Sequence, residues 1–278
     1  MQSGVATSCM AGMDFFRKLV ALITKNRARL ADAVIQELRQ RYAGSVLGLA
    51  WAVLYPLLLL GFYTTVYAFI FRVRPATMNE MSYVVLVLSG LVPLLAFIES
   101  MNASAGSLSA NRHILLNTVF PAELIPLRTV IATQMPSLSG LAMTLLAATA
   151  MGRTSFASLL VIPVLWLLLV MFVAGIAWIL SLVTLVLRDI QQALGIVGMT
   201  LMVLSPAAYT PEMVPHALKA VIYLNPLSYF VLSFQSVICY GKFPEIWHLA
   251  MVAILGIGTY VGGFFFFQRA KFVFFDHA

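Results

Sequence analysis

Long stretches without a charged residue dominate this sequence and limit the folds it can adopt more than any other feature. Seven such windows follow one another along the chain. They run from Tyr42 to Phe71, Met81 to Ile98, Thr129 to Gly152, Thr154 to Leu187, Ile190 to Pro211, Ala220 to Gly241 and Ile246 to Gln268. A helix needs about 20 apolar residues to cross a bilayer, so the windows predict an all-α, polytopic membrane protein.

The composition excludes the other broad classes of protein. Hydrophobic residues make up 62% of the chain and charged residues only 10%, against about 25% charged residues in an average soluble domain. A disordered chain is excluded by the same balance. Only two cysteines are present, Cys9 and Cys239, too few for a disulfide scaffold. The net charge of +7 does not indicate a nucleic-acid partner, because Lys and Arg mark the cytoplasmic loops of membrane proteins.

One of the seven windows differs from the others in composition. Ala220 to Gly241 contains Asn225, Pro226, Gln235 and several serines. Proline removes a backbone donor and disfavours helix at the residue before it, and a broken helix at membrane depth must be shielded by protein. We therefore predict a re-entrant hairpin at about 211–243, on the outer side. Six full spans remain, near 46–71, 81–101, 127–151, 157–187, 190–210 and 246–268.

Six spans place both termini on one side of the membrane, and positive charge indicates which side. With the N-terminus inside, most of the 17 Lys and Arg residues are cytoplasmic, and a seven-span alternative changes this excess only slightly. The extension at 1–28 and the tail at 272–278 are therefore predicted to be cytoplasmic. The extension lacks the apolar core of a signal peptide, and translation could start at Met1, Met10 or Met13.

A short amphipathic helix is predicted at 29–42, before the first span. Apolar side chains recur every four residues at Leu30, Val34, Leu38 and Tyr42. Such a stripe with basic flanks suits a helix that lies in the cytoplasmic interface, although a plain membrane anchor would show the same pattern. Glu37 and Arg41 are spaced for an ion pair within this helix.

The sequence contains no recognisable machinery for catalysis or energy coupling. It has no phosphate-binding loop and no His and Glu pair at metal-ligand spacing, so we expect no enzyme activity, cofactor or metal ion in this chain. The one charge inside a helix is Glu99, whereas ion-coupled carriers need ionisable groups along their path. The protein is expected to be passive or driven by a partner. Small residues in the last span predict close helix packing at Gly256, Gly258, Gly262 and Gly263.

Four short blocks of the sequence carry a family resemblance. The blocks are Arg41 to Trp51 followed by Pro56, Asn117 to Pro126, Leu187 to Ile190 with Ser205 to Tyr209, and Leu224 to Ser228. Together they resemble the permeases of type 2 ABC exporters for polysaccharides, the class that exports lipopolysaccharide O-antigen, teichoic acid or capsule. The blocks extend from about 37 to 245 in the family's order, and they assign 43–271 to a six-span transmembrane domain.

The resemblance implies a division of labour in a bacterial inner membrane. Two copies of the permease would form the channel as a homodimer, surrounded by membrane lipids, and two copies of a separate ATPase would bind ATP and Mg. The substrate would be a polysaccharide on an undecaprenyl diphosphate carrier, moved from cytoplasm to periplasm. O-antigen is the favoured polymer, with teichoic acid or capsule, or a drug or lipid in the same superfamily, as alternatives.

Two groups of candidate residues lie at opposite ends of the predicted bundle. In the family, the loop after the second span docks on the ATPase, which here assigns coupling to Asn111, Arg112 and His113; a solvated loop is the alternative. The break in the predicted hairpin assigns a periplasmic gate to Tyr223, Asn225, Pro226 and Tyr229. A seventh span kinked by proline is the alternative there.

Two further groups are assigned to the substrate. Arg39, Arg41 and Tyr42 lie where a lipid diphosphate head would arrive, and the arginine fork matches phosphate; ordinary positive-inside anchoring is the alternative. On the first span an aromatic stripe is predicted to line the channel at Trp51, Tyr55, Phe62 and Phe69. These residues fall on one helical face, although packing or interface anchoring would explain them too.

Overall fold

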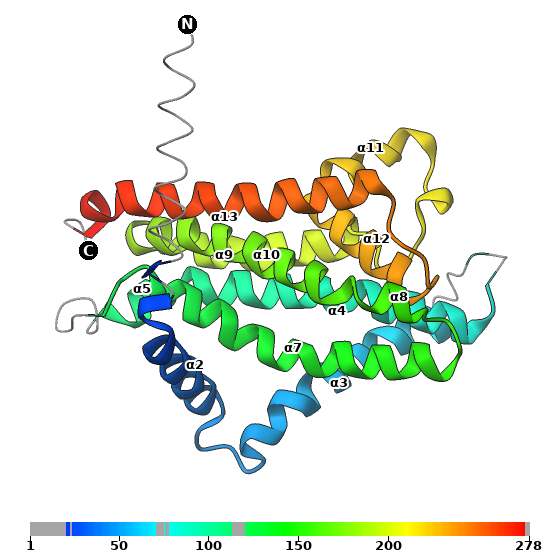
Figure 1. The fold of residues 1–278 in the computed structure, drawn as a ribbon, viewed down its shortest axis with the longest axis horizontal. Helices are drawn as coiled ribbons and strands as arrows, with labels where there is room; N and C mark the ends of the chain where they lie inside the picture. The colour runs from blue at the N-terminus through cyan, green and yellow to red at the C-terminus, as the bar shows by residue number, and fades with distance from the viewer. Residues whose placement is uncertain (1–20, 23, 71–74, 76–77, 113–119, 276–278) are drawn as a thin grey trace, which may run out of the picture.

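Long helices that lie side by side form the computed structural model (Figure 1), which describes residues 21–22, 24–70, 75, 78–112 and 120–275. In these residues all regular structure is helical, so the all-α prediction is confirmed for them. The helices are α2 (Arg27–Tyr42), α3 (Trp51–Thr65), α4 (Glu80–Ala105), α5 (Ser107–Ala110), α7 (Leu124–Ala150), α8 (Phe156–Leu159), α9 (Ile162–Val186), α10 (Asp189–Leu204), α11 (His216–Leu224), α12 (Pro226–Ile238) and α13 (Ile246–Phe275). Shorter helical turns are η1 (Gly48–Ala50), η2 (Val66–Ile70) and η3 (Pro211–Met213).

Five segments of the described chain are long and apolar enough to cross a membrane. They are Gly48–Thr65, Glu80–Ala105, Leu124–Ala150, Ile162–Val186 and Ile246–Lys271. The span predicted at 190–210 corresponds to α10, an apolar helix of 16 residues, which is shorter than the about 20 residues that a crossing needs. The polytopic membrane character is confirmed, whereas the number of six spans stays a prediction.

Local sequence determines where several helices begin. Gly44 and Gly48 adopt positive φ angles of 79° and 51°, which separate α2 from α3. The first candidate span therefore starts at Gly48, close to the predicted 46, and its α-helix starts at Trp51. Pro163 lies in the first turn of α9, where its missing N–H is tolerated, so this helix starts at Ile162 and not at 157. The side chain of Asn79 caps α4 by accepting a hydrogen bond from the Ser82 N–H at 2.9 Å.

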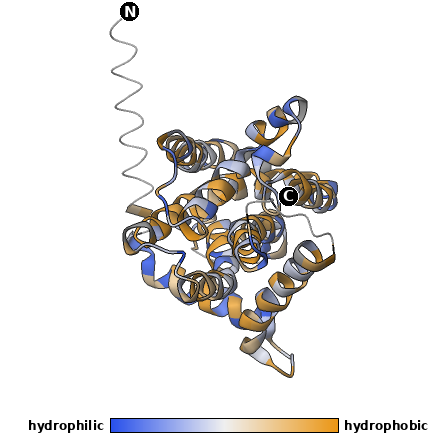
Figure 2. Ribbon diagram, turned by 90° about the vertical axis from the view of Figure 1, so that its right-hand side faces the viewer, coloured by the Kyte–Doolittle hydropathy of each residue, from blue (hydrophilic) through white to orange (hydrophobic). Residues whose placement is uncertain are grey.

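The bundle has two distinct ends. We call the α2 end the one with α2, α5 and the last turns of α13, and the α12 end the one with α8, α11 and α12 (Figure 1). α11 and α12, of 9 and 13 residues, meet at Asn225; the re-entrant path predicted for this segment stays a prediction. Seen from the α12 end, hydrophobic residues occupy the outer as well as the inner sides of the bundle (Figure 2), as expected of helices surrounded by lipid.

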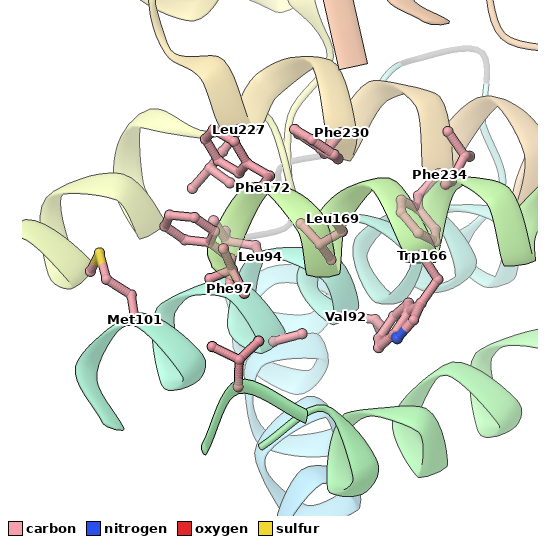
Figure 3. Packing of buried hydrophobic residues seen from close by; sticks show 14 of the residues in the cluster. Val92, Leu94, Phe97, Met101, Trp166, Leu169, Phe172, Leu227, Phe230 and Phe234 are labelled. Atoms are coloured by element: carbon pink, nitrogen blue, oxygen red, sulfur yellow. The ribbon is translucent and has the colours of Figure 1, made fainter. Parts of the chain in front are cut away.

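α4 lies at the centre of the bundle and is buried along most of its length. Aromatic rings join it to its neighbours. Phe97 of α4 stacks on Phe172 of α9 with ring centroids 5.3 Å apart, and Phe172 stacks on Phe230 of α12 at 5.2 Å (Figure 3). Lipid tails are as apolar as these side chains, so close packing and not exclusion from water distinguishes the folded bundle.

Glycines of α9 and α13 bring the backbones of these two helices into close contact. A Cβ atom at Gly263 would overlap the carbonyl group of Gly175, and one at Gly175 would overlap that of Thr259. Gly256 behaves similarly, because its Cβ would lie 2.8 Å from the Leu168 carbonyl oxygen. The predicted packing role is confirmed for Gly256 and Gly263. It is wrong for Gly258 and Gly262, which have no atom within 4 Å of a Cβ position because they face away from α9.

Gly263 and Gly262 provide a matched pair of substitutions. Gly263→Ala should lower the free energy of unfolding by about 1–3 kcal/mol, because the added methyl group meets rigid backbone. Gly262→Ala should leave it unchanged or raise it slightly, since alanine is the better helix former. Thermal unfolding of the two purified variants in one detergent compares them directly, and equal stability of both would contradict the close packing.

Candidate functional site

Two ion pairs hold α2 against the bundle. The Arg41 guanidinium lies 2.8 Å from the Glu99 carboxylate of α4, and Arg128 Nε of α7 lies 3.0 Å from Glu37 Oε2. The pair predicted within α2, between Glu37 and Arg41, is therefore wrong. Both side chains point at other helices because α2 packs along the bundle and turns these residues inward.

Arg128 of α7 contacts two other parts of the α2 end at once. Besides Glu37 of α2, it donates a hydrogen bond from Nη2 to Asn111 Oδ1 at 2.6 Å. Asn111 in turn donates from Nδ2 to the Ser107 carbonyl of α5 at 2.8 Å. The side chains of Arg128 and Glu37 are only 11% and 18% exposed, so little water competes for the pair. α2, α7 and the turn after α5 are thus joined through one guanidinium.

A third ion pair fixes the end of α13 to the start of α7. Glu123, just before α7, is buried, and its Oε1 accepts from Lys271 Nζ at 2.6 Å and from Gln268 Nε2 at 2.9 Å. The Glu123 carbonyl accepts a hydrogen bond from Trp178 Nε1 of α9 at 2.8 Å. A buried carboxylate needs polar partners, and both partners of this one come from α13, while the contact of Trp178 with the backbone adds α9.

The described residues that were predicted for coupling and for lipid entry lie at the α2 end. Asn111 is held by Arg128, Arg112 is exposed, and His113 lies outside the described residues. Arg39 is exposed, whereas Arg41 forms an ion pair with Glu99. Burial raises the pKa of Tyr42 above its ordinary value, so its phenol stays protonated at neutral pH.

The predicted aromatic stripe lies on the outer side of α3. Tyr55, Phe62 and Phe69 are exposed and Trp51 is half-buried, while Pro56, Leu60 and Thr64 lie on the side that packs on the bundle. Tyr55 also borders a small hollow that Glu99 of α4 lines. Phe69 belongs to the π-helical turn η2, so the regular helical spacing used to place it on this face does not extend to it. The stripe does not enclose a passage within one chain.

At the α12 end, Asn225 starts α12 and joins it to the segment after α10. The side chain of Asn225 accepts from the Leu227 N–H at 3.1 Å and donates to Ser205 Oγ at 2.8 Å, and Pro226 occupies the first helical position. The buried Tyr229 donates its hydroxyl to the Tyr223 carbonyl at 2.8 Å. The predicted gate residues therefore lie close together around the junction of α11 and α12. The hydroxyl of Tyr229 contacts the backbone of Tyr223 and not its ring.

The family of the chain follows from comparison with known proteins. Residues 33–239 match the family described as ABC-2 type transporter, which is most of the sequence. The chain belongs to the ABC-2 type transporter family. All four groups of predicted site residues lie within the matched residues 33–239.

Individual relatives cover nearly the same part of this ABC-2 transporter chain. It is 28% identical over 240 residues to the O-antigen export system permease protein RfbA of Klebsiella pneumoniae, which covers 86% of this chain and 90% of the relative. A protein of the same name from Myxococcus xanthus is 24% identical over 242 residues, 86% of this chain and 91% of the relative. The polysialic acid transport protein KpsM of Escherichia coli is 25% identical over 230 residues, which cover 81% of this chain and 86% of the relative.

Several residues that organise the ABC-2 chain were not identified from the sequence. Arg128, Glu37 and Glu123 combine through contacts far apart in sequence, which no short motif reveals. Gln235 is buried in α12 and donates to the carbonyl groups of Pro206 at 3.0 Å and Ala207 at 3.2 Å. An amide side chain in a window without charged residues is the available signal for it, because such groups need hydrogen-bond partners in lipid.

The contact between Arg128 and Glu37 can be measured by a double-mutant cycle. Arg128→Gln and Glu37→Gln should each lower the free energy of unfolding by about 2–3 kcal/mol, because each leaves a poorly hydrated charge without its partner. The double variant should lose less than the sum of the two. Thermal unfolding in detergent provides the measurement, and Arg112→Gln, an exposed position, is the control. Strict additivity would show that the two charges do not interact.

Proposed function

We propose that this chain is the membrane subunit of an ABC transporter that exports a polysaccharide, namely lipopolysaccharide O-antigen carried on undecaprenyl diphosphate. The observation that carries the proposal is the similarity to O-antigen export permeases over 86% of this chain and about nine-tenths of each relative. The similarity extends over most of the chain and is not confined to one motif. The relatives are permeases, which matches a chain in which we expect no catalytic centre.

A capsular polysaccharide is the second candidate substrate. The polysialic acid transport protein KpsM is 25% identical to this chain over 230 residues, which is close to the identity of the O-antigen permeases. Both candidates are long polymers, so the passage through the membrane would meet the same physical demands.

We assign the α2 end to the cytoplasm and the α12 end to the periplasm of a bacterial inner membrane. The exposed basic residues Arg27, Arg29, Arg39 and Arg269 lie at the α2 end, and positive charges are retained on the cytoplasmic side. Export then runs from the α2 end to the α12 end, with both termini cytoplasmic. Energy would come from two copies of an ATPase, which bind ATP and Mg, beneath two copies of this chain.

The channel in this proposal lies between the two copies. The aromatic stripe supports this placement, because it faces outward from a single chain, where a second copy can complete the wall. Aromatic faces attract the C–H faces of sugars weakly, and weak repeated contacts let a chain slide. At the cytoplasmic entrance, the exposed Arg39 is the arginine available for the lipid diphosphate, since Arg41 is neutralised by Glu99.

Deletion of the gene tests the proposed function. The surface polysaccharide should disappear while lipid-linked polymer accumulates in the cell, as seen by gel electrophoresis and lipid extraction. The wild-type gene and Val53→Ala, exposed on α3 but about 200° around the helix from Trp51, should restore export. Trp51→Ala combined with Tyr55→Ala, and Arg39→Gln, should not. Loss of capsule with O-antigen retained would move the assignment to the second candidate, and retention of both would refute export.

Arg112 tests the coupling assignment. It is exposed directly after α5, where the proposed ATPase would dock. Arg112→Glu should leave assembly intact and reduce polymer export and polymer-dependent ATP hydrolysis at least tenfold, because the reversed charge repels the docking surface. Arg29→Glu, a reversal at an exposed site on α2, is the control. If both variants export normally, the loop does not transmit the power stroke.

A further inference from the structure

A cavity at the α12 end is not used by any group of residues assigned above, apart from Tyr223. Its volume is about 970 Å³, and its walls come from the turn η3 after α10, from α12 and from the start of α13. Cavities of about 300–1,000 Å³ are typical of sites for small ligands. This cavity lies within a single chain, so it differs from a passage between two copies.

Three aromatic side chains line the cavity from three separate segments. Tyr223 of α11, Tyr240 after α12 and Trp247 of α13 all border it, and they are 44%, 42% and 56% exposed. Large rings that remain this exposed next to one hollow present flat apolar faces to whatever enters. The C–H faces of sugar rings are the natural complement of such surfaces.

The Trp247 side chain packs against a buried aromatic ring. Its indole meets the buried ring of Tyr229 edge-to-face, with centroids 6.2 Å apart and an interplanar angle of 79°. Tyr229 is itself fixed by the hydrogen bond from its hydroxyl to the Tyr223 carbonyl. The cavity wall at Gln235 is equally fixed, because this 2% exposed side chain is bound to the carbonyl groups of Pro206 and Ala207. A preformed wall loses little entropy when a ligand binds.

The charges around the cavity restrict the ligand. Glu212, Glu245 and Lys242 border it, and His248, also in the lining, lies 3.8 Å from the Glu245 carboxylate. The carboxylates outnumber the ammonium group, and this balance disfavours phosphates and other anions. Carboxylates accept and ammonium groups donate hydrogen bonds, and hydroxyl groups can do both, so the same side chains match a neutral, polyhydroxylated ligand.

We propose that this cavity binds a short, uncharged stretch of saccharide, with Trp247 as the stacking platform and Glu212, Glu245 and Lys242 as partners for its hydroxyl groups. The proposal deepens the proposed function and rests on it, because it places a sugar site beside the exit of an exported polymer. Binding there would hold the emerging chain for a short time and oppose its return. The contact must be weak, since a tight site would stall transport.

Calorimetric titration of the purified transporter, with its ATPase and in lipid nanodiscs, tests the site. The probe is an oligosaccharide cut from the surface polysaccharide of the source organism and freed of lipid. Trp247→Ala should weaken binding at least tenfold and Tyr240→Leu should also weaken it, whereas Trp247→Phe should retain most of the affinity. Phe243→Ala, which removes an exposed ring of the same segment outside the cavity lining, should bind as the wild type does.

Three outcomes would overturn the inference. They are wild-type affinity in both Trp247→Ala and Tyr240→Leu, an equal loss in Phe243→Ala, and displacement of the oligosaccharide by inorganic pyrophosphate, which would indicate an anion site. Thermal unfolding of each variant identifies losses of binding that come from misfolding. If Trp247→Ala proves unstable, the affinity of Tyr240→Leu decides whether the cavity binds the oligosaccharide. The deletion strain separates the two proposals: if it loses its polysaccharide while the variants bind normally, only this inference fails.

Discussion

In lipid, the polypeptide backbone has no water to bond with, and this constraint underlies the whole structure. It forces the long apolar windows into helices, whose backbone groups are satisfied internally. It also removes the usual force that drives helices together, so they are held by close fit. The contact of Gly175 with Gly263 and the stacked rings of Phe97, Phe172 and Phe230 are the results of that requirement.

Charged contacts are concentrated where the apolar layer ends. At the α2 end, Arg41, Arg128 and Lys271 each meet a carboxylate from another segment. These pairs fix α2 and the last turns of α13, and Arg128 also binds the turn after α5; these are the parts that an ATPase beneath the bundle would reach first. A displacement of the turn at Asn111 would therefore pass to α2 through Arg128, without any need to deform the apolar interior.

The α12 end is organised by neutral hydrogen bonds. Asn225 and Gln235 bind the chain that follows α10, and Tyr229 closes α11 onto α12. These contacts leave a hollow with aromatic walls that two carboxylates and one ammonium group border. The two ends thus suit different partners: a charged protein surface at one end and a neutral sugar chain at the other.

Much of the architecture could be predicted from the sequence, because it depends on local pattern. Uncharged windows predict helices, Asn225 and Pro226 predict a break in the helix, and the motifs between 37 and 245 indicate the family. Partners distant in sequence could not be predicted. Glu37 was assigned to Arg41, four residues away, but pairs with Arg128, and only two of the four glycines in the last span touch α9. Helical periodicity places residues on a face, whereas the rotation and contacts of that face are decided by packing between helices.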